Sequence, residues 1–192
     1  LSSVSVGRRR LFVLYWGDAE SDPTRLIENW LTEHAYSAAD HWYGNVRVTT
    51  YGLAPLPDEP QRELDARFGE AIRLRGYSLT GDRFEPGDIL PITLYWESMV
   101  PVSERYKVTV QLLDSGGVLR AQRDAEPGNG LYPTTEWAQS ATTIDRLGVG
   151  LPPDLATDDY SLVVGMYHIS SGERLPVAGR TDHVRLGTVT VR

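Results

Sequence analysis

Alternating apolar and polar residues dominate the chain after residue 70. Alternation of this kind places successive side chains on opposite faces of a strand. Groups rich in glycine, proline and aspartate separate the alternating runs, as turns do between antiparallel strands. The pattern predicts strands over residues 71–79, 89–97, 106–114, 118–124, 141–147, 160–169, 174–177 and 184–191. A series of short strands without a helical period indicates a mainly-β fold, an immunoglobulin-like antiparallel β-sandwich.

The first part of the chain has a different pattern. Residues 11–16 form an apolar run and residues 46–53 alternate, so both predict strands. Between them, Asp22 and Pro23 are typical of a helix start, with Asp22 as the N-cap of a helix over residues 23–35. Four apolar residues would share one face of this helix: Leu26, Ile27, Trp30 and Leu31. This order predicts a small N-terminal β-α-β appendage with a right-handed crossover.

Proline and charged residues accumulate between these two patterns. The segment 57–68 is the best linker candidate, because such a composition disfavours both helix and central strand. We therefore predict three parts: a small α/β unit over residues 1–56, a linker over 57–68 and the β-sandwich over 69–192.

Composition excludes several classes of function. The net charge of -7 argues against a nucleic-acid partner, whose phosphates require a basic surface. Without cysteine, the chain has no disulfide and no cysteine-ligated zinc. No apolar run reaches the roughly 20 residues that span a bilayer. The one basic run, residues 8–10, is interpreted as a solvated or membrane-adjacent flank.

Several motifs, taken in order, resemble a known protein family. They are DPTRL at 22–26, WYGNVR at 42–47, PGDILPITLYW at 86–96, VQLLDSG at 110–116, GLYPTTEW at 130–137 and LPPDLATDDYSLVVGMY at 151–167. Together they resemble the extracytoplasmic tail of large Chloroflexi-type membrane glycosyltransferases, which are similar to dolichyl-phosphate-mannose protein mannosyltransferases. Since the chain starts at Leu1 without a methionine, we expect it to be part of a longer protein.

The resemblance implies a non-catalytic accessory domain on the extracytoplasmic face of the cell membrane. Its expected partners are the membrane-embedded remainder of the parent protein and a glycan acceptor. The catalytic carboxylates of such enzymes lie in loops between transmembrane helices, so the resemblance transfers no catalytic residue to this chain.

Residues that could carry out catalysis form no recognised pattern. Asp18, Glu20 and Asp22 could bind a hard cation, but their spacing is weak evidence and Asp22 already has a capping role. The four histidines have no metal-ligand spacing, and neither a G-x-S-x-G elbow nor a phosphate-binding loop is present. We therefore predict no enzyme activity, no cofactor and no metal site for this chain.

The best candidate for ligand binding is the long loop over residues 123–137. It combines aromatic rings with amide, carboxylate and guanidinium groups, a mixture that suits sugars because rings stack on pyranose C–H surfaces. The candidate residues are Arg123, Asp124, Asn129, Tyr132 and Trp137. In the alternative interpretation, Tyr132 and Trp137 fold the loop back onto the edge of the sandwich.

Other aromatic residues favour structural roles. We expect Trp42 and Tyr43 to be packed, and Trp96 to lie in the core with Tyr95 on the opposite face of its strand. Tyr160 follows an LPPD turn and resembles a tyrosine corner, in which the hydroxyl bonds to the backbone.

Three functional hypotheses follow. The first is the accessory domain of a membrane glycosyltransferase, which positions an acceptor glycan or a partner. The second is a carbohydrate-binding β-sandwich module that acts on its own. The third is an enzyme, for example a glycosidase with two opposed carboxylates.

Overall fold

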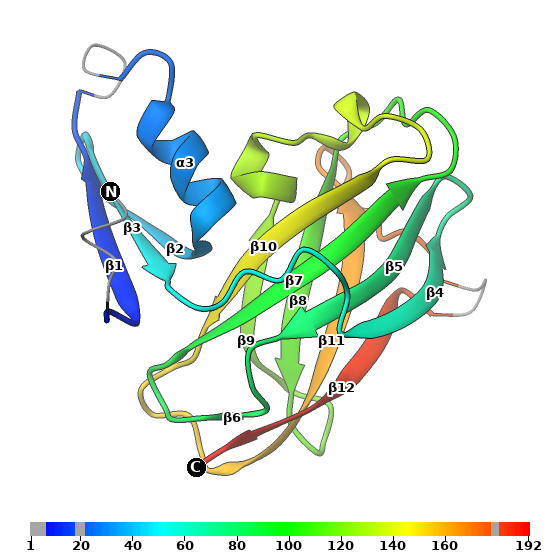
Figure 1. Cartoon of the computed structure of the whole chain (residues 1–192). Helices are drawn as coiled ribbons and strands as arrows, with labels where there is room; N and C mark the ends of the chain where they lie inside the picture. Colours follow the sequence, from blue (N-terminus) through cyan, green and yellow to red (C-terminus); the bar gives the residue numbers. More distant parts are fainter. Residues whose placement is uncertain (1–6, 18–21, 178–180) are drawn as a thin grey trace.

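The computed structural model describes residues 7–17, 22–177 and 181–192, and Figure 1 shows two β-sheets packed as a sandwich. One sheet has seven strands in the order β1-β3-β2-β10-β7-β5-β4, and the other has five in the order β6-β12-β11-β8-β9. The seven strands of the first sheet are β1 (Arg10–Tyr15), β2 (Tyr36–Tyr43), β3 (Val46–Gly52), β4 (Arg62–Phe68), β5 (Ile72–Leu79), β7 (Ile89–Ser98) and β10 (Thr142–Gly150). The second sheet contains β6 (Arg83–Phe84), β8 (Tyr106–Leu113), β9 (Leu119–Ala125), β11 (Asp158–His168) and β12 (His183–Val191). The predicted mainly-β sandwich is confirmed.

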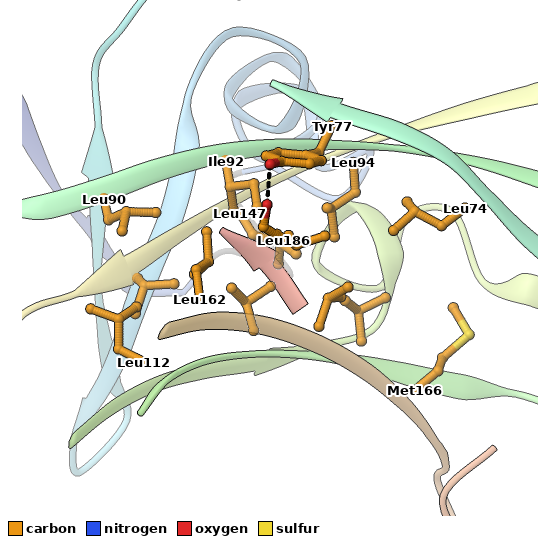
Figure 2. Packing of buried hydrophobic residues seen from close by; sticks show 14 of the residues in the cluster. Leu74, Tyr77, Leu90, Ile92, Leu94, Leu112, Leu147, Leu162, Met166 and Leu186 are labelled. Atoms are coloured by element: carbon orange, nitrogen blue, oxygen red, sulfur yellow. Dashed lines mark hydrogen bonds between the residues drawn. The ribbon is translucent and has the colours of Figure 1, made fainter. Parts of the chain in front are cut away.

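The core lies between the two sheets. Alternate residues of β7 point inward, and the largest of them, Trp96, is fully buried, as its position in the pattern predicts. Figure 2 shows leucines from β7 facing Leu112 and Leu162 of the second sheet. At one side of this core the Tyr77 hydroxyl donates a hydrogen bond to the Leu186 carbonyl, so the one polar atom that β5 sends inward is satisfied.

The second half of the predicted linker is a strand. Arg62–Phe68 is β4, which pairs antiparallel with β5 at the edge of the seven-stranded sheet. Its many charges mislead a sequence-based prediction, because an edge strand keeps charged side chains in solvent. The predicted strand at 174–177 is also wrong in part: it makes isolated bridges, Tyr167↔Arg174 and Phe68↔Val177, instead of a ladder.

Residues 54–60 cross the face of the seven-stranded sheet that is turned away from the second sheet, here called the outer face (Figure 1). Two tyrosine hydroxyls from that face hold the segment. Tyr36 donates to the Pro55 carbonyl at 2.8 Å, and Tyr95 donates to the Pro57 carbonyl at 2.8 Å. This part of the predicted linker is therefore packed on the sheet, and we call it the strap.

The N-terminal unit contains a strand that the sequence pattern missed. After the helix, Tyr36–Tyr43 forms β2, and a tight turn at Gly44 and Asn45 leads back into β3. β3 lies between β1 and β2 and is antiparallel to both. The predicted crossover from the first strand to residues 46–53 is therefore wrong, because the helix joins β1 to β2. A Gly-Asn pair between two short runs is a hairpin signal that could have revealed β2.

The helix α3 (Leu26–His34) is shorter than predicted. Arg25 has a left-handed backbone with φ 54°, so the regular helix cannot begin at Pro23. The N-cap residue is Arg25, so the predicted N-cap Asp22 is wrong. The Asp22 carboxylate nevertheless accepts the first free N–H groups of the helix, from Leu26 at 2.8 Å and from Ile27 at 3.0 Å. On the expected apolar face only Leu31 is fully buried. The other two acidic residues of this loop, Asp18 and Glu20, lie outside the described residues.

The N-terminal strands continue the large sheet of the sandwich. β2 and β10 run parallel to each other and are joined at one residue pair, Ser37 opposite Leu147. The helix α3 covers the face of β1, β3 and β2 that points to the same side as the second sheet, through the cluster of Leu31, Ala35 and Tyr51. The division into separate domains at residues 1–56 and 69–192 stays a prediction, although one sheet connects the two parts.

Candidate ligand-binding site

The loop between β9 and β10 contributes one wall of a pocket of about 400 Å³. Two short 3-10 turns shape this loop, η1 (Pro127–Gly130) and η2 (Thr134–Glu136). The first part of β10 contributes the other wall. The polar and aromatic lining residues are Tyr132, Glu136, Trp137, Thr142, Thr143 and Arg146.

Glycine and buried hydrogen bonds fix the shape of the loop. Gly128 has φ 61°, and a Cβ atom there would lie 2.3 Å from the Tyr132 ring, so no larger residue fits. The Gly128 N–H donates to Oδ1 of Asp145 at 2.9 Å. The indole of Trp137 donates to the Tyr132 carbonyl at 2.9 Å, which closes the loop on itself.

Two of the five predicted ligand residues line this pocket, Tyr132 and Trp137. Trp137 is only 8% exposed and packs at 6.4 Å between ring centroids on Trp96, so it presents little more than an edge. For Trp137, the structure agrees with the alternative interpretation of a loop folded back on the sandwich. Tyr132 is half-buried and lines the pocket.

Arg123 and Asn129 lie elsewhere, in a polar network between the sandwich and the N-terminal unit. The Arg123 guanidinium lies 2.9 Å from Oδ1 of Asn129, 3.0 Å from the Ser37 hydroxyl and 3.2 Å from Oδ2 of Asp40. These contacts connect β9 to β2. They also occupy the Arg123 guanidinium and the Asn129 side chain, which the sequence predicted to bind a sugar. No sequence signal could have shown this pairing, because Arg123 and its β2 partners are far apart in the chain.

The remaining candidate, Asp124, is not part of the pocket either. It lies on β9 opposite Thr109 of β8, and its Oδ1 is buried without a hydrogen-bond partner among the described residues. Ligand binding by the five predicted residues stays a prediction, but they do not form one cluster.

A buried ion pair supports the N-terminal unit. Glu28 of α3 is almost fully buried and accepts hydrogen bonds from Arg47 at 2.9 Å and from Arg25 at 2.9 Å. Burial alone would raise the pKa of Glu28, but the hydrogen bonds from Arg47 and Arg25 outweigh it and the pKa is lowered. Glu28 is therefore ionised in the folded chain and is committed to structure.

Asp145 is the one described carboxyl group with a raised pKa. Complete burial raises its pKa from 3.8 to about 6, although the Gly128 N–H, the Trp96 indole and the charges of Arg123 and Arg146 act in the opposite direction. A raised carboxyl pKa is a mark of general acids. Asp145 has no access to solvent, however, and its side chain does not line the pocket.

Other expectations have mixed outcomes. Tyr160 is confirmed as a tyrosine corner, since its hydroxyl donates to the Ala156 carbonyl at 2.7 Å. Tyr95 lies on the face opposite Trp96, as expected, where the strap buries it. The expected packing of Trp42 and Tyr43 is wrong, because they are 66% and 68% exposed. The sequence pattern did not predict the strand β2, so it could not show that both side chains lie at the exposed end of a strand.

Within residues 7–17, 22–177 and 181–192, no group of three or more histidine, aspartate or glutamate side chains could hold a metal ion. Three of the described histidines have partners: His34 contacts the Trp30 carbonyl at 2.8 Å, His168 lies 3.1 Å from Glu104, and His183 lies 2.7 Å from Asp182. None of the helices in the described part of the chain is long and apolar enough to cross a bilayer.

Comparisons with known proteins identify no family. No family model matches the sequence, and no curated protein matches it. Among solved structures, the chain is similar to the C-terminal domain of Wzt at 11% identity, with 70% of this chain and 82% of that chain covered and a TM-score of 0.44. It is also similar to a Niemann-Pick type C2 protein from Japanese carpenter ant at 6% identity, with 71% and 100% covered and a TM-score of 0.41.

A third similar structure is a calcium binding mutant of β-glucuronidase 2 from Bacteroides uniformis. It is 13% identical, with 74% of this chain and 15% of that chain covered and a TM-score of 0.39. Likenesses as distant as these three carry no assignment of function, so the site must be interpreted from its own residues.

Proposed function

We propose that this chain is a non-catalytic binding module that holds a glycan in the pocket beside Tyr132. The observation that carries the proposal is the lining of that pocket. It combines the half-buried aromatic residue Tyr132 with a carboxylic acid, a guanidinium and a hydroxyl residue: Glu136, Arg146 and Thr142. An aromatic face with a few polar groups around it is the arrangement that a pyranose ring requires.

The fixed shape and the volume of the pocket support this proposal. Its wall is a loop held by buried contacts of Gly128 and Trp137, so the Tyr132 ring is pre-positioned. A pre-organised site loses less conformational entropy when a ligand binds. The volume of about 400 Å³ is sufficient for one or two sugar units.

The carboxylates support a role without catalysis. Glycoside hydrolysis uses two carboxyl groups on opposite sides of the scissile bond. Glu136 is the one carboxylate among the residues that line the pocket, and Asp145 is enclosed in the protein. The pocket therefore offers binding groups without the pair that this reaction requires.

The experiment is a glycan-array screen of the purified chain, followed by titration of the best hit. Tyr132→Ala is expected to weaken binding about tenfold or more, because it removes the stacking surface. Trp42→Ala serves as the matched control, since Trp42 is an exposed aromatic residue outside the pocket. A folded sample without any hit, or equal effects of the two variants, would contradict the proposal.

The cellular context that we propose is an accessory domain of a membrane glycosyltransferase, on the extracytoplasmic face of the membrane. The ordered motifs from residue 22 to residue 167 support it, with no catalytic residue assigned to this chain. The test is the reading frame of the gene. Multiple transmembrane helices encoded before Leu1 are expected, whereas a short reading frame without them would leave the independent module as the function.

A further inference from the structure

The outer face of the N-terminal strands is apolar and uncovered. On the edge strand β1, Phe12 and Leu14 lie opposite Thr50 and Val48 of β3, so these four side chains share a face. Phe12 is 58% exposed and Leu14 is 69% exposed. An exposed row of large apolar side chains on a sheet indicates an interaction surface.

Aromatic residues extend this face on both sides. Trp16, directly after β1, is 72% exposed, and Tyr43 lies opposite Val46 in the β2–β3 hairpin. The neighbouring part of the outer face is different, because the strap covers it around Tyr36 and Tyr95 and bonds to their hydroxyls. The uncovered patch is thus confined to β1, β3 and the end of β2, and we call it the apolar face.

Arginines gather at one end of the apolar face. Residues 8–10 are exposed arginines, and Arg10 occupies the same face of β1 as Phe12. Beside them lies a pocket of about 350 Å³ whose lining includes Arg9, Arg10 and Arg83. Its one carboxylate, Asp88, accepts the Glu85 N–H at 2.9 Å within its own turn and forms no ion pair with these arginines in the described part of the chain. The Arg10 guanidinium donates to the Gly87 carbonyl at 2.5 Å, which holds it beside the pocket without neutralising its charge.

This pocket opens on the outer face. Ile89 and Pro91 line it, and they alternate along β7 with the core residues Leu90 and Ile92. Along β1, β2 and β3, the outer-face positions contain no aspartate or glutamate; Asp40 points to the opposite face, toward Arg123. A chain with a net charge of -7 therefore keeps one surface that is cationic at one end and apolar beyond it.

We propose that the apolar face and the arginine pocket together form a docking surface for an anionic lipid bilayer. Tryptophan, tyrosine and phenylalanine are suited to the region between headgroups and acyl chains, because their rings are apolar with a polar edge. Arginines near the surface attract anionic headgroups, and a pocket with three guanidinium groups can enclose a phosphate. A protein partner would need no such separation of arginines from aromatic residues.

The test is co-sedimentation of the full chain with two kinds of vesicles, pure phosphatidylcholine and phosphatidylcholine with about one-third phosphatidylglycerol. Binding to the anionic vesicles is expected, with weakening as salt rises. Leu14→Ser with Trp16→Ser, and separately Arg9→Gln with Arg83→Gln, should each reduce binding about tenfold or more.

Matched controls lie on other surfaces of the chain. Trp42→Ser removes an equally exposed aromatic residue from the opposite face of the same hairpin, where Trp42 pairs with Arg47. Arg67→Gln with Arg185→Gln removes the same charge from exposed positions on other strands. Both controls should bind vesicles like the unchanged chain. This result would show that net charge and exposed aromatic area alone do not determine vesicle binding.

Three results would overturn the proposal. The first is no binding to anionic vesicles by a folded sample. The second is equal loss in the control variants. The third is a dimer in light scattering that Leu14→Ser with Trp16→Ser disrupts, because the apolar face would then be an interface between two copies. Glycan binding through Tyr132 uses a different surface, so its outcome is independent of this test.

Discussion

The sandwich and the N-terminal unit bury their shared sheet in different ways. In the sandwich, β7 is covered on one face by the second sheet and on the other by the strap. In the N-terminal unit, α3 covers one face through a cluster of three fully buried residues, and the other face is exposed. One end of the sheet is therefore stabilised by an apolar core, and the strands at the other end are held in place largely by polar contacts.

The junction between these regions shows what replaces the missing apolar burial. Arg123 reaches Asp40 and Ser37 across the junction, and within the N-terminal unit Arg47 reaches Glu28, so charged groups at low exposure connect the elements. Such pairs contribute little net free energy but are costly to break, because each leaves a buried charge behind. The N-terminal unit is therefore defined by specific polar partners more than by apolar area.

The largest expected effect comes from the sandwich core. Trp96→Ala should lower the free energy of unfolding by about 4 kcal/mol, because it empties a fully buried aromatic site against Phe68 and Trp137. Urea denaturation measures the change. Trp42→Ala, at an exposed position, should alter it by less than about 0.5 kcal/mol. A small effect of Trp96→Ala would contradict the packing described for β7.

The next effect depends on pH and on Asp145. Because burial raises its pKa to about 6, the folded chain binds a proton more tightly than the unfolded chain does. Its contribution to stability is complete below about pH 4 and is lost as the pH rises through about 6, at a cost of about 3 kcal/mol. Asp145→Asn should remove this step from unfolding curves measured between pH 4 and 7. An unchanged slope in the variant would refute the assignment.

A smaller and local effect is expected in the N-terminal unit. Leu31→Ala should cost about 2–3 kcal/mol, at the lower end for a buried leucine, since the small cluster around it can partly collapse. Hydrogen exchange should show lost protection in α3, β1 and β3 while β8 and β11 keep theirs. Equal loss in all strands would mean that the chain unfolds as one unit, against the predicted division at residues 57–68.

The smallest effect tests a single hydrogen bond of the sandwich. Tyr160→Phe removes the hydroxyl that donates to the Ala156 carbonyl and should lower the free energy of unfolding by about 1 kcal/mol. Tyr43→Phe is the control in the N-terminal unit, where the exposed hydroxyl should contribute almost nothing. Thermal unfolding of both variants compares them directly, and a larger loss in Tyr43→Phe would reverse the comparison.

Local patterns predicted the sandwich well because its strands carry their signals within a few residues. The alternation around Trp96 and the LPPD turn before Tyr160 each consist of a few consecutive residues, so no distant contact is needed to interpret them. The edge strand β4 was missed because its charges resemble those of a loop. The position of Arg123 could not be predicted, since Asp40 meets it across two strands that the sequence does not relate. The exposure of Tyr43 depends on whether another segment covers its face of the sheet. The alternation of apolar and polar residues does not specify which segment packs there.

The parallel contact between Ser37 and Leu147 sets a constraint on synthesis at the ribosome. β2 emerges about 110 residues before the strand β10 that it joins. Until β10 is made, β1, β2 and β3 have the small cluster around Leu31 as their own core, and Asp40 lacks its partner until Arg123 of β9 has been made. The N-terminal strands are therefore made first but can join the sandwich only after β10 has been made, and the nascent chain lacks this contact for most of its translation.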